Sequence, residues 1–282
     1  RSTRHIAIIG RYSITELPLS VQSKISIGLT VIGSGNIPGP GIAQSWDVTD
    51  EGKTVTFNLN PSLTWQDGSQ VRSQDIMYSF RGADIQYPNP EQIVFKLQDP
   101  YSPLLSLVSR PVFKQKSSRL GQQIIGTGSY RISTYKQTGG VIDTLTLTPV
   151  SAENHLPLLV YHFYTSAQQA RNAYKLGTID EILDLPEPSD LSSWPNADVA
   201  VRIQEDRYVA LFFNTQDPFL SGTAGRNLRL SLAYAIDKSA YYSRAISPIA
   251  PSSWAYNPIS IGSRHAWLKH DNWWKFNYWI TR

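Results

Sequence analysis

The 282-residue sequence contains no cysteine. Disulfide bonds, thiolate zinc sites, iron–sulfur clusters and cysteine nucleophiles are therefore excluded. Charged residues make up only 17% of the chain, below the roughly 25% that is typical of soluble domains. The sequence also lacks an apolar run of about 18 residues, the length that a membrane-spanning helix requires. Any signal peptide or membrane anchor is expected upstream of Arg1.

The sequence also lacks the motifs of the common catalytic and cofactor sites. HExxH, GxSxG and GxxxxGK[ST] do not occur, and Gly33–Gly41 does not have GxGxxG spacing, so we predict a plain loop there. His155 and His162 are the nearest histidine pair in the body of the chain, and their spacing is not that of a metal site. We therefore expect no enzyme activity, no catalytic residues, no cofactor and no metal.

Charge is concentrated at the C-terminal end. Residues 259–282 contain four basic residues and one acidic residue, and the formal net charge of the whole chain is +4. The body is thus close to neutral, without the basic face of a nucleic-acid-binding protein. The same end holds four of the eight tryptophans, at positions 267, 273, 274 and 279. We treat residues 259–282 as an atypical Trp-rich tail.

What is present is a mixture of strand and helix patterns. Apolar residues alternate over Thr54–Leu59 and Ile93–Leu97, and further strands are predicted at Thr144–Thr148, Val160–Tyr164 and Tyr208–Asn214. Helices are predicted from Ser73 toward Phe80, after an N-cap at Ser166, and around Leu228–Ala235. Because strands and helices do not alternate strictly, we expect a mixed α/β (α+β) fold.

One stretch carries a specific resemblance. It contains Ala43-Gln-Ser-Trp46, then Asp50-Glu-Gly-Lys53 before an alternating strand, then Trp65-Gln-Asp-Gly68 and Asp75-Ile-Met-Tyr-Ser-Phe80. In this order the stretch resembles the signature region of family 5 extracellular solute-binding proteins, the peptide and nickel receptors of ABC transporters. Later landmarks agree, among them Gly126-Thr-Gly-Ser-Tyr130 and Leu211-Phe-Phe-Asn-Thr215.

The resemblance implies a periplasmic-binding-protein-like two-lobe fold of the peptide-binding type. Lobe I would comprise residues 1–42 and 116–207, a small lobe II residues 43–115, and residues 208–258 the start of an incomplete lobe III. Members of the family normally continue well beyond Trp254-Ala-Tyr256. A truncation or a change of reading frame near Pro258 is therefore expected.

The implied function is capture of a short peptide or similar small solute by hinge closure, for delivery to the permease subunits of an ABC importer. We expect a monomer outside the cytoplasm, with no nucleic acid partner and with membrane contact only through an upstream anchor. Two alternatives stay open: the ligand-sensing domain of a regulator, and a truncated fragment that binds nothing. The candidate ligand contacts, each weighed against a packing or structural role, are Tyr12, Trp65, Asn214, Trp254 and Tyr256.

Overall fold

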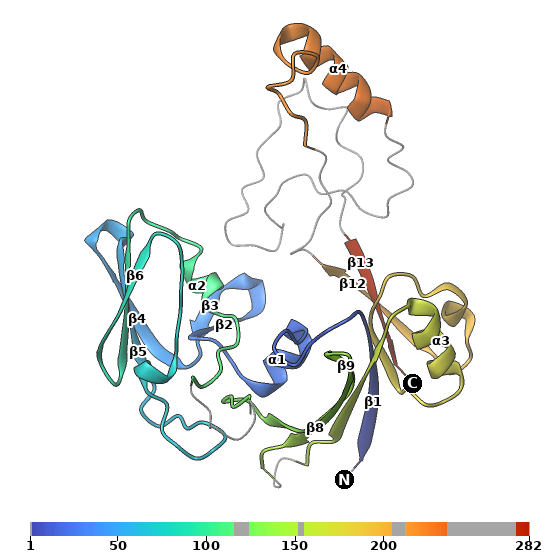
Figure 1. Ribbon diagram of the computed structural model, residues 1–282, viewed down its shortest axis with the longest axis horizontal. Helices are drawn as coiled ribbons and strands as arrows, with labels where there is room; N and C mark the ends of the chain where they lie inside the picture. The colour runs from blue at the N-terminus through green and yellow to red at the C-terminus, as the bar shows by residue number, and fades with distance from the viewer. Residues whose placement is uncertain (1, 116–123, 152–154, 205–211, 236–274, 282) are drawn as a thin grey trace. The chain divides into compact units, whose positions relative to one another are not determined.

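The computed structural model describes residues 2–115, 124–151, 155–204, 212–235 and 275–281 (Figure 1). The chain divides into two compact units. Unit 1 comprises residues 1–183 with the last two residues, and unit 2 comprises residues 184–280. Within the described part of the chain, no helix has both the length and the apolar character needed to cross a membrane.

The large sheet of unit 1 runs in the order β11-β1-β10-β9-β8. Its central strand β1 (Thr3–Ile9) is parallel to both β10 (Leu158–Tyr164) and β11 (Glu181–Leu185). The strands β9 (Val141–Pro149) and β8 (Tyr130–Thr138) continue the sheet in antiparallel fashion. The predicted strands at 144–148 and 160–164 are confirmed within β9 and β10.

Two helices belong to this sheet. Helix α1 (Leu19–Ile25) buries Val21 and Ile25 in a core with the apolar residues of β1, β9 and β10. Helix α3 (Ala167–Lys175) packs on β1 and β10 and buries Ala170 and Tyr174. Its N-cap is Ser166, whose hydroxyl accepts a hydrogen bond from the backbone N–H of Gln169, as the sequence predicts.

The small sheet of unit 1 is antiparallel, with the order β4-β5-β7-β6. Its strands are β4 (Ala43–Thr49), β5 (Thr54–Leu59), β7 (Gln92–Leu97) and β6 (Ala83–Asn89). Alternate residues of β5 and β7 are buried, which confirms both predicted strands. They form a second core, separate from that of the large sheet, with Trp65, Ile76 and the short helix α2 (Leu104–Leu107).

Two local predictions in unit 1 were wrong. The segment from Ser73 toward Phe80 is not a helix; only Ser73–Asp75 forms a 3-10 turn, and Ile76 is extended. Tyr78 and Phe80 both contact the ring of Phe95, at centroid distances of 5.5 and 6.0 Å. Residues two apart reach the same neighbour only in an extended chain, so this aromatic packing opposes a helix.

The predicted loop at Gly33–Gly41 is instead largely a β-hairpin. Strand β2 (Thr30–Ile32) pairs with β3 (Pro38–Pro40), and a 3-10 turn at Ser34–Asn36 joins them. Pro38 and Pro40 lie on β3, a strand at the edge of a sheet, where proline is tolerated although it has no backbone N–H to donate to a neighbouring strand.

Unit 2 contains a 3-10 helix at Ser189–Ser193, the strands β12 (Asp198–Gln204) and β13 (Lys275–Thr281), and the helix α4 (Gly222–Ala235). Helix α4 confirms the predicted helix around Leu228–Ala235. The predicted strand Tyr208–Asn214 lies partly outside the described residues. Its described end, residues 212–214, is not a strand, and Phe212 is 86% exposed instead of buried.

Candidate functional site

Tyr12 lies just beyond the carboxyl ends of two parallel strands. Ile9 of β1 is in register with Tyr164 of β10, and the backbone N–H of Gly10 donates to the carbonyl of Tyr164 over 2.8 Å. In open α/β sheets, ligands bind at the carboxyl ends of parallel strands. The carboxyl ends of β1 and β10 are therefore the first candidate for a ligand site.

The position of Tyr12 is set by its neighbours. Its ring lies 5.6 Å from that of Phe163, and its backbone carbonyl accepts from the N–H of Ile142 over 2.9 Å. Gly10 has φ +139, and a Cβ there would lie 2.7 Å from Cε2 of Tyr12. Glycine thus allows the half-buried ring to fold back over the end of β1.

The two cores of unit 1 meet at a junction built around Gln66. Its side-chain Nε2 lies 2.9, 3.1 and 2.6 Å from the carbonyl oxygens of Ile25, Gly128 and Tyr130, so its two N–H groups serve three acceptors and one of them is shared. Its side-chain oxygen accepts from the backbone N–H of Gly126 over 3.3 Å. Gln66 therefore ties the turn that follows β5 to the end of α1 and to the segment that leads into β8.

Close backbone packing makes this junction tight. A Cβ on Gly126 would lie 2.1 Å from the carbonyl oxygen of Ile25, and one on Gly128 would lie 2.6 Å from that of Lys24. The buried Ser26 hydroxyl donates to the carbonyl of Val112 and accepts from the N–H of Thr127. The Gly-Thr-Gly sequence is thus a point of backbone contact between the two cores.

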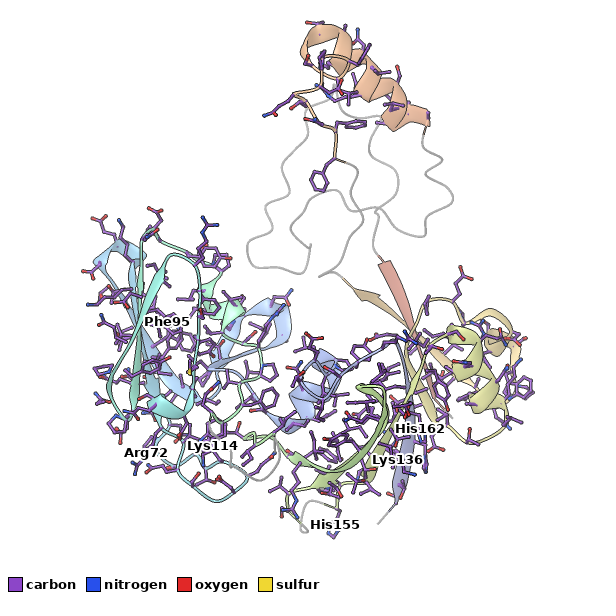
Figure 2. All side chains as sticks on the ribbon, viewed as in Figure 1. Arg72, Phe95, Lys114, Lys136, His155 and His162 are labelled. Atoms are coloured by element: carbon purple, nitrogen blue, oxygen red, sulfur yellow. The ribbon has the colours of Figure 1, made fainter. Side chains whose placement is uncertain are left out.

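An ion pair reinforces the same turn. Lys114, labelled in Figure 2, is one partner of the pair. Its Nζ lies 2.6 Å from Asp67 Oδ2 and 2.7 Å from the hydroxyl of Ser69. Burial by itself raises the pKa of Asp67, but hydrogen bonds from Lys114 and Ser69 and the charge of Lys114 lower it to about 2. Asp67 is therefore a structural anion of the junction.

A histidine pair lies on the large sheet. Nδ1 of His5 on β1 is 3.0 Å from Nε2 of His162 on β10 (Figure 2). The pKa of His162 is lowered by burial, which disfavours its charged form, and by the charge of His5. Sequence spacing pointed to His155 as the neighbour of His162, because the parallel register that joins β1 to β10 is not visible in the sequence. Within the described residues, no group of three potential ligands surrounds a metal position.

Within unit 1, the structure places the predicted ligand contacts Tyr12 and Trp65 against different cores. Tyr12 lies against the large-sheet core, whereas Trp65 is 1% exposed in the small-sheet core and donates through its indole N–H to Asp75 over 3.1 Å. Trp65 could contact a ligand only if its ring left this core. In this structure Trp65 therefore has the packing role that was weighed against ligand contact. Asn214, in unit 2, is exposed and its side-chain oxygen accepts from the N–H of Gln216 within a turn. Trp254 and Tyr256 lie outside the described residues.

Comparisons of the sequence and of the structure with known proteins both find solute-binding proteins. The family model for bacterial extracellular solute-binding proteins, family 5, middle region, matches residues 38–273. The dipeptide-binding protein of Escherichia coli K12 is 21% identical over 284 aligned positions, which cover 77% of this chain and 51% of that protein.

Solved structures that share the fold include two with bound ligands. NikZ from Campylobacter jejuni, in complex with Ni(L-His), is 22% identical with a TM-score of 0.64, covering 84% of this chain and 54% of that one. AppA from Bacillus subtilis, in complex with a nonapeptide, is 15% identical with a TM-score of 0.67, covering 91% and 60%. The chain therefore spans only about half to three-fifths of the length of these relatives.

Proposed function

Since the chain belongs to the bacterial extracellular solute-binding proteins of family 5, which bind solutes and are not enzymes, we propose that it captures a short peptide outside the cytoplasm for an ABC importer. The observation that carries the proposal is the placement of Tyr12 at the carboxyl edge of β1 and β10. The relative from Escherichia coli is named for dipeptide binding, and AppA was solved with a nonapeptide.

Two further observations support this function. The chain contains more than one compact part, and hinge closure needs parts that can move as bodies. The two separate cores of unit 1 support a division into two lobes: the large-sheet core lies in the proposed lobe I (residues 1–42 and 116–207), and the small-sheet core lies mostly in the proposed lobe II (43–115), with Leu29 and Ile42 as its buried members from lobe I. Lobe III would begin at residue 208.

The proposed mechanism has no covalent step. The ligand shifts the equilibrium toward a closed state because it makes more contacts there than in the open state. The Tyr12 ring offers an apolar face with a hydroxyl, which suits a peptide side chain next to a main-chain polar group. The permease subunits of an importer would then receive the closed, loaded form.

Calorimetric titration tests this function with two kinds of probe: a pool of di- and tripeptides, and the nickel complex of L-histidine. We expect heat from the peptides and a loss of affinity of about tenfold or more in Tyr12→Ala, because a buried aromatic contact contributes more than about 1.4 kcal/mol. Tyr135→Ala is the matched control, since Tyr135 is 43% exposed on β8.

Three results would contradict the proposal. Binding of the nickel complex alone would reassign the ligand. Equal peptide affinity in wild type and Tyr12→Ala would show that the carboxyl ends of β1 and β10 are not part of the peptide site. If neither the peptides nor the nickel complex bind, the result would support the alternative that the chain is a truncated fragment that binds nothing.

A further inference from the structure

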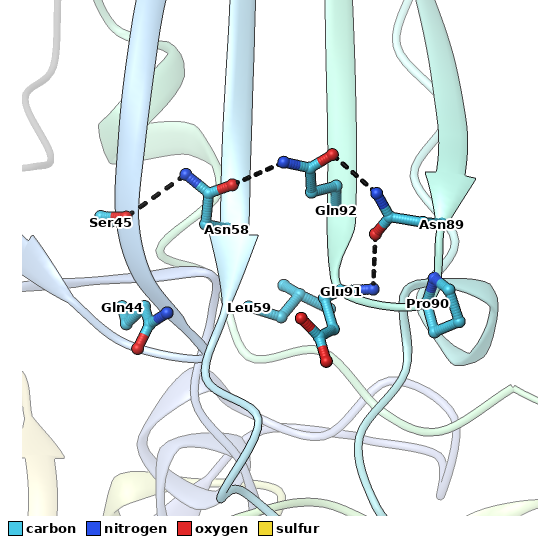
Figure 3. Close-up of a pocket in the computed structure, with 8 residues that line it drawn as sticks. All are labelled: Gln44, Ser45, Asn58, Leu59, Asn89, Pro90, Glu91 and Gln92. Carbon is cyan, nitrogen blue, oxygen red and sulfur yellow. Dashed lines mark hydrogen bonds between the residues drawn. The ribbon is translucent and has the colours of Figure 1, made fainter.

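A pocket of about 530 Å³ opens at one end of the small sheet (Figure 3). Tyr12 and the residues of the large-sheet core are not part of its lining. Its volume falls in the range of small-molecule sites, about 300–1,000 Å³. It lies where β5 ends and β7 begins, between the neighbouring ends of β4 and β6. The lining consists of Gln44, Ser45, Asn58, Leu59, Asn89, Pro90, Glu91 and Gln92.

One wall of the pocket is a row of side-chain amides that crosses three strands (Figure 3). Asn89 Nδ2 donates to Gln92 Oε1 over 2.8 Å, and Gln92 Nε2 donates to Asn58 Oδ1 over 2.9 Å. Asn58 Nδ2 then donates to the hydroxyl of Ser45 over 3.3 Å. Asn58 Nδ2 also donates to Asp47 Oδ2 over 3.1 Å, so both of its N–H groups are used. Each amide has two N–H groups and two acceptor lone pairs, so Asn89 and Gln92 each keep one N–H group, and the row keeps acceptor lone pairs, for a ligand.

Strand irregularities flank the pocket on both sides. The register between β4 and β5 shifts between Ala43 and Ser45, and the register between β6 and β7 shifts between Gln86 and Asn89. Bulges of this kind redirect side chains and are frequent beside binding sites. Gln44, at the first shift, is exposed and has no side-chain hydrogen bond among the described residues.

The pocket carries one uncompensated charge. The backbone N–H of Glu91 donates to Asn89 Oδ1 over 3.0 Å, and its carbonyl accepts from Leu59 over 2.7 Å. Its exposed carboxylate has no hydrogen-bond or ion-pair partner in the described part of the chain. Neither lysine nor arginine lines the pocket, so a bound anion would meet repulsion instead of a partner.

The polar lining and the charge of the pocket indicate the chemical class of its ligand. An apolar ligand would find only Leu59 and Pro90, and an anion would be repelled by Glu91. Amide groups pair with hydroxyl groups as both donor and acceptor, and a carboxylate pairs best with an ammonium group. We propose that this pocket binds a small molecule that carries several hydroxyl groups and one amino group, of which a hexosamine is the simplest case.

Nuclear magnetic resonance titration of the whole chain tests the pocket, with D-glucosamine and D-glucose as probes at about pH 6, where the amine is protonated. We expect glucosamine to bind about tenfold more tightly than glucose, because its charged amine can form an ion-paired hydrogen bond with the carboxylate of Glu91, which the hydroxyl of glucose cannot. Glu91→Gln should remove this preference, and Gln44→Ala should weaken both ligands.

Gln86→Ala is the matched control, because Gln86 is an exposed residue of β6 outside the pocket lining. It should leave both affinities unchanged, and thermal melts establish that all variants fold. A preference for glucosamine that survives in Glu91→Gln would overturn the proposal, and so would the absence of binding by both sugars. The peptide titration of Glu91→Gln should match that of the wild type, which separates failure of this site from failure of the proposed peptide site.

Discussion

His5 and His162 show how two residues 157 positions apart become one chemical unit. Parallel pairing of β1 and β10 places their ring nitrogens 3.0 Å apart. Burial, and after it the charge of His5, disfavour the protonated form of His162 in the folded chain.

The free energy of unfolding should fall as the pH is lowered below about 6.5, the ordinary pKa of histidine. The pKa of His162 is lower in the folded chain, by burial and by the charge of His5. Below the ordinary pKa the unfolded chain therefore binds a proton that the folded chain binds only at lower pH, which favours unfolding. Urea unfolding between pH 5 and 8 measures this slope.

His162→Gln should flatten the slope, whereas the matched change His155→Gln should leave it unaltered, since His155 is exposed. An unchanged slope in His162→Gln would show that other groups dominate the pH dependence in this range.

At the scale of elements, Gln66 is the main connection between the turn after β5 and the large-sheet core. Its side chain makes bonds to four backbone groups of two separate segments. The hydroxyl of Ser26 also links the end of α1 to Thr127, but it does not reach the turn after β5, which Gln66 joins to both segments.

Gln66→Leu should reduce the free energy of unfolding by about 2–4 kcal/mol, because it leaves several half-buried backbone groups without partners. Urea unfolding of unit 1, followed by tryptophan fluorescence, measures the loss. Gln70→Leu is the matched control: Gln70 is exposed and makes one bond, to the carbonyl of Pro61. Equal losses in the two variants would contradict the role given to Gln66.

Elements with local signals were predicted well. Alternating burial in β5 and β7 and the Ser166 cap of α3 follow from neighbouring residues alone. The helix predicted after Ser73 failed because Tyr78 and Phe80 pack on Phe95, a contact made only in the folded sheet. The same limit applies to the candidate sites. Tyr12 was proposed from the sequence, but the amide row of Asn58, Gln92 and Asn89 depends on the register of three strands, which the sequence does not reveal.

At the scale of the whole molecule, the chain combines a large mixed sheet, a small antiparallel sheet and a second unit that begins at Asp184. Family 5 membership accounts for this combination, and the chain covers 51–60% of the length of the three relatives compared. The central question is therefore whether the residues present suffice to hold a ligand. Binding to the folded state alone would stabilise that state by mass action.

Thermal unfolding of this chain, with and without a pool of short peptides, answers the question most directly. At a ligand concentration 100 times the Kd, binding adds about 2.7 kcal/mol to the free energy of unfolding. For a chain of this size, the account predicts a cooperative melt whose Tm rises by roughly 5–10 °C. A broad melt that the peptides do not change would contradict the account, because it would mean that this chain does not form a peptide site.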